Sequence, residues 1–243
     1  MSRFFVNKDA VKGNSIIISG KEAHHIIDVM RLKVQDKVVT FDGAGREYAG
    51  FIKEAGRKSV IIEIVEVRTP HGRTTYGITL LQAIPKKDKM DYIVEKSTEL
   101  GVSKIIPLVT ERTIPNWDEP KKASSVERWR KIATEASKQC GRADIPEIGL
   151  IKNFSDISAN TVGFGLSLIA ALDDGAIRLK DALSGFGPGK VAIAVGPEGD
   201  FTPGEVARAK EIGFKVVNLG SRVLKSDTAG LFMLAILNYE LTN

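Results

Sequence analysis

Hydrophobic and polar residues alternate along the first 70 residues in the manner of short β-strands. Apolar runs cover 15–20, 37–43, 46–52 and 59–68, and the last of these alternates Ile and Val with Glu. That period of two is typical of a half-buried strand. The Asp-Gly pair at 42–43 is a hairpin signal. Several short strands joined by turns in so short a stretch predict a small antiparallel β-barrel.

One helix interrupts these strands. Ala, Ile and Met recur at intervals of three and four within 21–32, which is the spacing of one helix face. Pro, Gly and hydroxyl residues gather at 69–75, a composition typical of a linker. We therefore expect an N-terminal domain of residues 1–70 and a second domain of residues 76–243.

From residue 76 onward the pattern changes to strands that alternate with helices. The short apolar runs are 77–83, 104–110, 166–172, 191–195 and 216–219. Helical spacing covers 87–101, 119–140, 203–212 and the segment that starts at Thr228. Continuous apolar strands between helices predict an α/β fold built on a parallel sheet.

Composition limits the classes of protein to which the chain can belong, but it does not indicate a function. The chain has 243 residues, of which 43% are hydrophobic and 27% charged, as in ordinary globular proteins. No apolar run approaches the roughly 18 residues of a membrane span, and the first residues lack the apolar stretch of a secretory signal. The single cysteine, Cys140, excludes an internal disulfide and a Cys-rich zinc site. We expect a cytoplasmic protein that does not enter a membrane.

The net charge of +5 is distributed unevenly. Residues 1–145 carry 26 Lys and Arg against 19 Asp and Glu, whereas residues 146–243 carry 9 against 11. A basic excess of this kind favours a polyanionic partner such as a nucleic acid. An ordinary soluble surface rich in lysine accounts for it equally well.

Two glycine-bearing loops carry the candidate chemistry. The strand at 191–195 runs into Gly196–Gly199, and the strand at 216–219 runs into Gly220 and a polar loop that ends at Asp227. Ligands of open α/β sheets bind at this carboxyl edge. The chain has no P-loop motif, and the Gly-rich stretch 185–190 precedes a strand instead of following one, so a nucleotide-binding fingerprint is absent.

At this point the chain closely resembles the bacterial 16S ribosomal RNA uridine-N3 methyltransferases of the SPOUT (trefoil-knot) class. The matching motifs are GPEGDF (196–201), LGSRVLKSDTA (219–229), QAIPKKDKMDYIVEKSTELGVSKIIPLVTER (82–112), RWRKIATEASKQCGR (128–142), RFFV (3–6) and HHIIDVMRL (24–32). The chain departs from the usual family pattern at Asp200, where a glycine is common, and at Lys225 and Asp227, where Arg and Glu are common.

The resemblance implies a fold and a cofactor. It implies a SPOUT-type parallel sheet with a deep trefoil knot over about residues 190–229, and a PUA-like RNA-binding N-terminal domain. It also implies S-adenosyl-L-methionine held by three knot loops, in a homodimer with each site at the subunit interface. The implied cofactor-binding residues are Leu172, Gly196, Pro197, Glu198, Gly199, Leu219, Gly220, Val223, Leu224, Lys225, Thr228 and Ala229. The final apolar helix suits a dimer face or the core of one subunit equally.

The implied reaction is methylation of N3 of one uridine, uridine 1498, in 16S rRNA of the small ribosomal subunit. Uracil N3 is a poor nucleophile while protonated, so a cation near a uracil carbonyl favours the reactive form. We expect Arg222, Lys225 or Arg112 to supply that cation. Glu198 or Asp227 accepts the proton or positions a neighbour, and a purely structural role is the alternative for each carboxylate.

The N-terminal domain supplies the expected RNA contacts. These are Arg3, His24, His25, Arg31 and Arg46, with an ordinary domain surface as the alternative. The pair His24-His25 lacks further ligands nearby in sequence, so no metal site is expected. Two other functions are weighed: an RNA-binding or ribosome-assembly protein that has lost catalysis, and a nucleotide-dependent oxidoreductase, which the missing fingerprint argues against.

Overall fold

The computed structural model describes residues 2–56, 58–69, 76–158, 165–187 and 189–242. Most of the expected linker, 70–75, lies outside the described residues. The chain divides into two compact units, one of Met1–Arg73 with Thr134–Ile145 and the other of Thr74–Ala133 with Pro146–Asn243. The division therefore differs from two consecutive segments, because residues 134–145 join the N-terminal unit.

The N-terminal unit is built on a six-stranded sheet with the order β1-β4-β5-β6-β3-β2. Its strands are β1 (Arg3–Phe5), β2 (Val11–Lys12), β3 (Ser15–Ser19), β4 (Lys37–Phe41), β5 (Glu47–Ala55) and β6 (Ser59–Arg68). All neighbours are antiparallel except β1 and β4, which are parallel. Among the described residues β1 and β2 form the two edges, so the sheet is curled but open.

Apolar side chains on the inner face of this sheet form the core of the unit. Phe4, Ile16, Val38, Ile52 and Ile62 are all buried there. The strand at 59–68 is observed with the predicted bounds. Register shifts between β5 and β6 at Ala49/Gly50 and Ile52/Glu54 bend the pair in the way that β-bulges do.

The predicted helix at 21–32 is shorter and less regular than its spacing indicates. It consists of α1 (Gly20–His24) and a π-helical turn, η2 (His25–Val29). Met30 N–H donates to the carbonyl of His25 at 2.9 Å, a bond that spans five residues. Arg31 then adopts a φ of +54°, which ends the helix because a left-handed residue cannot continue it.

Residues 134–145 belong to the N-terminal unit through specific bonds. They include the end of α3 (Glu119–Cys140). The Gly45 N–H donates to the Ala143 carbonyl and the Ile145 N–H to the Gly43 carbonyl, both at 3.0 Å. Lys138 forms an ion pair with Glu22. A strand-edge pairing between segments so far apart in sequence leaves no local pattern, which is why the sequence placed this segment elsewhere.

The C-terminal unit is built on an eight-stranded parallel sheet. Its order is β10-β8-β7-β13-β11-β14-β12, with β9 paired to β8. The strands are β7 (Gly77–Ala83), β8 (Lys104–Val109), β9 (Glu147–Ile148), β10 (Lys152–Asn153), β11 (Leu166–Ala170), β12 (Ile177–Arg178), β13 (Lys190–Val195) and β14 (Lys215–Asn218). The predicted parallel α/β fold is confirmed.

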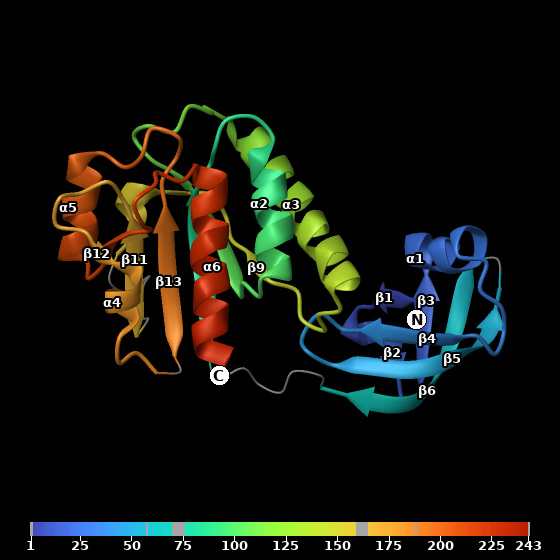
Figure 1. Ribbon diagram of the computed structural model, residues 1–243. Coiled ribbons are helices and arrows are strands. Elements are labelled where there is room, and N and C mark those ends of the chain that lie inside the picture. The colour runs from blue at the N-terminus through green and yellow to red at the C-terminus, as the bar shows by residue number, and fades with distance from the viewer. Residues whose placement is uncertain (1, 57, 70–75, 159–164, 188, 243) are drawn as a thin grey trace. The chain divides into compact units, whose positions relative to one another are not determined.

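Helices cover both faces of the parallel sheet (Figure 1). They are α2 (Lys89–Glu99), α3, α4 (Leu179–Leu183), α5 (Pro203–Glu211) and α6 (Ser226–Thr242). One face packs Leu81, Ile169 and Ala194 against Val206 and Ala209 of α5. The other face receives α6 and α2, and a Cβ at Gly230 of α6 would lie 3.5 Å from Leu80 Cδ1. Burial of both faces explains the continuous apolar strands.

The strand order places the two glycine-bearing loops together. Strands β13, β11 and β14 are neighbours and parallel, so their carboxyl ends meet at one edge of the sheet. A capping box begins α5, with Glu205 N–H donating to Thr202 Oγ1 at 3.2 Å and Thr202 N–H to Glu205 Oε2 at 2.8 Å. Within the described residues, no helix has the length and apolar character that crossing a membrane requires.

Candidate functional site

A pocket of about 430 Å³ lies at the carboxyl edge of β11, β13 and β14. Three segments form it: 170–172, 195–200 and 217–229. The structure brings most of the predicted cofactor residues to it, namely Leu172, Gly196, Pro197, Glu198, Leu219, Gly220, Val223, Leu224, Lys225 and Ala229. Gly199 and Thr228 do not line it. Arg222 lines it, whereas Asp227 and Arg112 do not.

Asp200 fixes the shape of the loop that follows β13. One of its carboxylate oxygens accepts from Leu172 N–H at 2.9 Å, and the other accepts from Phe201 N–H at 2.8 Å. The residue has a φ of +60°, a conformation that glycine adopts more readily. The two hydrogen bonds of the Asp200 carboxylate therefore offset the strain of its backbone conformation. One of them connects this loop to the loop after β11. In the sequence, Asp200 stands out only as a departure from a family pattern, and no local signal indicates this role.

Gly196 sits where this loop turns back on itself. A Cβ at this position would lie 3.2 Å from the backbone carbon and carboxylate of Asp200 and from the Phe201 ring. These neighbours belong to the loop itself, so the need for glycine comes from loop closure as well as from access to a ligand.

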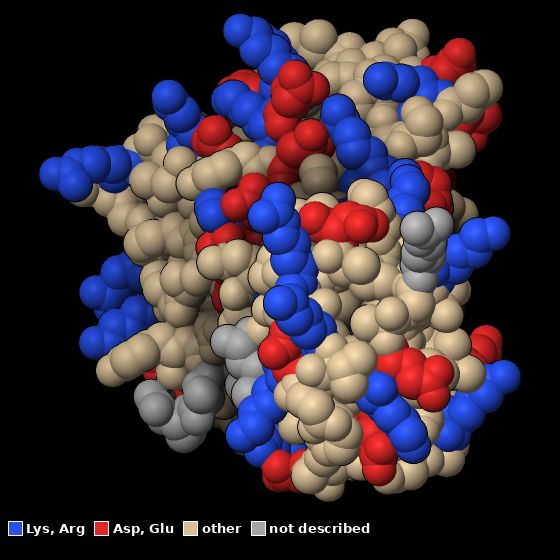
Figure 2. All heavy atoms as spheres, turned by 90° about the vertical axis from the view of Figure 1, so that its right-hand side faces the viewer, with Lys and Arg blue, Asp and Glu red and all other residues tan. Residues whose placement is uncertain are grey.

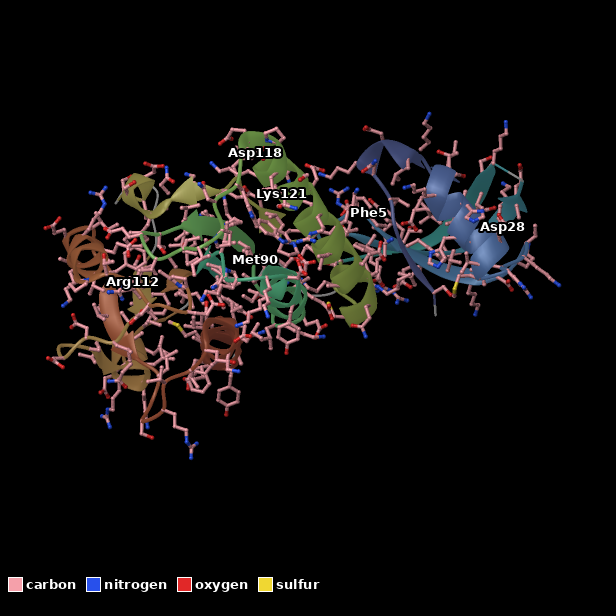
Figure 3. The ribbon with its side chains drawn as sticks, turned by 90° about the horizontal axis from the view of Figure 1, so that it is seen from above. Phe5, Asp28, Met90, Arg112, Asp118 and Lys121 are labelled. Carbon is pink, nitrogen blue, oxygen red and sulfur yellow. The ribbon has the colours of Figure 1, made fainter. Side chains whose placement is uncertain are left out.

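Arg112 braces the same loop from outside the pocket. Its Nη1 donates to the carbonyl of Gly199 at 2.6 Å and to that of Phe201 at 3.4 Å. Figure 3 labels Arg112, which comes from the segment after β8. Its guanidinium is therefore engaged by backbone, which suits a supporting role better than the predicted contact with the substrate.

The Glu198 carboxylate is held by one cation and by backbone N–H groups. Lys89 Nζ lies 3.2 Å from Glu198 Oε1 and 3.8 Å from Asp227 Oδ2, and Lys86 N–H donates to both oxygens of Glu198. Partial burial raises the pKa of the Glu198 carboxyl, but hydrogen bonds from its own backbone, Lys89 and Lys86 outweigh it and the pKa lies below its usual value. Glu198 is therefore ionised at neutral pH.

Arg222 and Lys225 are the exposed cations of the pocket. Neither forms an ion pair with another described residue. Leu172 and Val223, with 72% and 76% of their surface exposed, are apolar residues of the same rim. Asn218, Ser221 and Ser226 also line the pocket. They were not predicted, although the polar run after Gly220 pointed to their neighbourhood.

The five residues expected to contact RNA fall into two groups. The Arg3 guanidinium forms an ion pair with Glu47, donates to the Arg142 carbonyl and lies over the Phe41 ring. His25 packs its ring edge-on against Phe4. These two serve the fold of the N-terminal unit.

The other three residues are exposed. The side chains of Arg31 and Arg46 form no hydrogen bond or ion pair with another described residue, and His24 Nδ1 lies 2.6 Å from Asp28 Oδ2. No three His, Cys, Asp or Glu side chains gather as a metal site within the described ranges. On the face that Figure 2 shows, Lys and Arg are interspersed with Asp and Glu instead of forming one basic area.

Comparison with known sequences defines the class. The family described as RNA methyltransferase domain matches residues 73–238, and the family described as RNA methyltransferase PUA domain matches residues 18–65. The first match covers more than half of the chain. The chain therefore belongs to the RNA methyltransferase family, with a PUA domain at its N-terminus.

Individual relatives are similar over most of their length. The chain is 28% identical to ribosomal RNA small subunit methyltransferase E of Bacillus subtilis, over 99% of this chain and 97% of the relative. It is 26% identical to the protein of the same name from Mycobacterium bovis, over 93% and 87%. The crystal structure of the Neisseria gonorrhoeae methyltransferase E bound to S-adenosyl methionine superposes with a TM-score of 0.86 at 29% identity, covering 99% of this chain and 98% of that one.

Proposed function

We propose that the protein transfers a methyl group from S-adenosyl-L-methionine to N3 of a uridine, uridine 1498, in 16S rRNA of the small ribosomal subunit. The observation that carries the proposal is the pocket at the carboxyl edge of β11, β13 and β14, with two exposed cations on it. Support comes also from the family membership and from relatives named as methyltransferases of small-subunit ribosomal RNA.

The residues of the pocket fit this cofactor. Leu172, Val223 and Leu224 offer apolar contact for the adenosine, and the glycine-bearing loops bring backbone polar groups within reach of its polar edges. When bound, the cofactor supplies an electrophilic methyl group, so this chain needs no covalent intermediate. Glu198, an ionised carboxylate on the pocket wall, suits the positive charge of a sulfonium.

The remaining chemistry falls to the cations. Uracil N3 reacts after it loses its proton, and the charge then spreads to the two flanking carbonyl oxygens. Arg222 and Lys225 stabilise that charge, because neither forms an ion pair with a carboxylate of the described residues. Hydrogen bonds from its own backbone, from Lys89 and from Lys86 keep Glu198 ionised, so it is a weak base at neutral pH. Besides facing the sulfonium, Glu198 orients Lys89, which also lies near Asp227, and the proton leaves through Asp227 or water.

The proposal includes the wider family architecture. The N-terminal unit binds RNA through Arg31, Arg46 and His24. The chain over about residues 190–229 forms a trefoil knot, and two copies form a homodimer in the cytoplasm. Exposed Leu172 and Val223 on the pocket, and Phe232 and Tyr239 on α6, support an apolar surface for the second copy. Light scattering tests the dimer.

The direct test is transfer of a labelled methyl group. Purified protein is mixed with labelled S-adenosyl-L-methionine and with either small ribosomal subunits or free 16S rRNA that lack the modification. We expect label in 16S rRNA, mapped to N3 of one uridine. Label at another base or atom contradicts the site of methylation. Cofactor binding without transfer to either substrate supports the non-catalytic RNA-binding alternative instead.

A further inference from the structure

A chain of buried hydrogen bonds runs beneath the pocket. Gln82, the sixth residue of β7, is fully buried, and its Nε2 donates to Ala83 O and to Ser226 Oγ, each at 3.0 Å. Ser226 is also buried, and its hydroxyl donates to the carbonyl of Gly196 at 2.5 Å. Three elements are joined in this way: β7, the first residue of α6 and the end of β13.

The hydrogen atoms in this series of hydrogen bonds can be placed in only one way. A hydroxyl has a single hydrogen, which Ser226 uses on Gly196 O, so its oxygen must accept from Gln82. The amide nitrogen has two hydrogens, and both are used. The Gln82 side chain therefore fixes the rotation of the Ser226 hydroxyl, and that hydroxyl points at the Gly196 carbonyl.

The Gly196 carbonyl is the only hydrogen-bonding group of its peptide unit. The next residue is Pro197, which has no N–H. The orientation of the 196–197 peptide plane therefore depends on what holds this carbonyl. Gly196 and Pro197 both line the pocket, so the bond from Ser226 sets the surface that a ligand meets.

Stability alone does not account for an amide at position 82. Gln82 Oε1 is buried and has no hydrogen-bond partner among the described residues, which is unfavourable for folding. Gly230 of α6 faces it, and a Cβ there would lie 3.1 Å from Oε1. An apolar side chain would fill this space without an unsatisfied oxygen. The amide is explained by its two donated bonds.

We propose that Gln82 and Ser226 are positioning residues that orient the Gly196 carbonyl and thereby set the affinity for the methyl donor. The inference rests on the proposed location of the cofactor. Ser226 acts directly on the loop, and Gln82 acts through Ser226. Neither residue touches the reacting atoms.

The test compares Ser226→Ala, Gln82→Met and the double variant by titration calorimetry with S-adenosyl-L-methionine. Loss of the hydroxyl leaves a buried carbonyl unpaired, so Ser226→Ala should weaken binding about tenfold or more. Gln82→Met should have a smaller effect, because the hydroxyl remains but rotates freely. The double variant should bind no worse than Ser226→Ala, because both changes act on one carbonyl.

Ser97→Ala is the matched control. Ser97 is another fully buried serine of the same unit, and its hydroxyl has no partner among the described residues. It should change the melting temperature at most and leave the affinity unaltered. Ser226→Thr keeps the hydroxyl and should restore binding to within about threefold of the original.

A Ser226→Ala affinity no weaker than that of Ser97→Ala overturns the inference. A double variant whose loss of affinity equals the product of the two single losses also overturns it. If Ser226→Ala does not fold, Gln82→Met and Ser226→Thr still test the inference. Unchanged affinity for the cofactor in Gln82→Met would show that the amide has no role in positioning. A wrong cofactor location is distinguishable, since Gly196→Val would then also bind normally.

Discussion

The pocket loops of the C-terminal unit and the N-terminal unit both combine charged side chains that are held by other groups with charged side chains that are exposed. Around the pocket, Asp200 and Arg112 are bonded to backbone, whereas Arg222 and Lys225 are exposed. In the N-terminal unit Arg3 is paired with Glu47, whereas Arg31 and Arg46 are exposed. In both regions some charged side chains support the fold and others are available to bind a ligand. The sequence motifs contain both kinds, and only the structure distinguishes them.

The largest expected effect is loss of cofactor binding in Gly196→Val. A branched side chain would collide with Asp200 and Phe201 and displace the loop that carries the pocket wall. We expect affinity for S-adenosyl-L-methionine to fall at least about 100-fold, equivalent to about 2.7 kcal/mol or more. The control is Gly187→Val, at a loop glycine whose Cβ would meet nothing within 4 Å. Calorimetry that shows equal affinities in two folded variants rejects the placement of the site.

Arg222→Ala should lower kcat by about 10²–10³ while KM for the small subunit changes little. A donor that stabilises charge only in the transition state has this signature. Lys225→Arg should be tolerated, because the positive charge is retained. Lys215→Ala, which removes an exposed cation at the opposite end of β14, is the matched control. An increase in KM with unchanged kcat would move Arg222 from catalysis to RNA binding.

Arg3 and the pair Arg31 and Arg46 should respond in opposite ways. Arg3→Ala leaves Glu47 buried without its partner and should reduce the free energy of unfolding by about 2–3 kcal/mol. Arg31→Ala with Arg46→Ala should leave stability unchanged and weaken RNA binding.

The salt dependence of RNA affinity checks this contrast. Each lost phosphate contact should reduce the slope of log K against log salt by about 0.7–0.9. Thermal unfolding of the same variants measures the predicted differences in stability. Two results would contradict the separation between supporting and available charges. One is a reduced slope for Arg3→Ala, and the other is an unchanged slope for the variant that combines Arg31→Ala with Arg46→Ala.

The smallest expected effect is the pH dependence contributed by Glu198. Its pKa in the folded protein lies below its usual value of 4.5. The stabilisation by the backbone hydrogen bonds and by Lys89 is therefore complete above about pH 4.5 and is lost as the pH falls through the lower folded pKa. Because the pair is partly exposed, Glu198→Gln should reduce the free energy of unfolding at pH 7 by less than about 1 kcal/mol. The difference from the original protein should shrink as the pH falls below 4.5 and Glu198 becomes protonated, as followed by urea unfolding.

Local pattern was sufficient for most elements of the fold. The strand at 59–68, the strand at 77–83 and the helix at 119–140 are observed with their predicted bounds. The helix at 21–32 was wrong in length because a π-helical turn and the left-handed Arg31 follow α1. A residue's tolerance of that conformation depends on its surroundings, which spacing does not encode.

The sequence predicted which loops form the candidate site, but it did not predict the hydrogen bonds that hold those loops in place. Glycines after two strands located the pocket, because parallel strands bring their carboxyl ends together. Asp200, Gln82 and Ser226 were missed, since their partners lie 28, 144 and 30 residues away in sequence. Burial of one amide beneath one hydroxyl is a tertiary feature with no periodicity of its own.

A crystal structure of the protein with S-adenosyl-L-methionine tests the central claim most directly. The account predicts the cofactor in the pocket formed by residues 170–172, 195–200 and 217–229, with its methyl group directed toward Arg222 and with the Ser226 hydroxyl still bonded to the Gly196 carbonyl. Cofactor bound elsewhere in the molecule, with this pocket empty at saturating concentration, would contradict it.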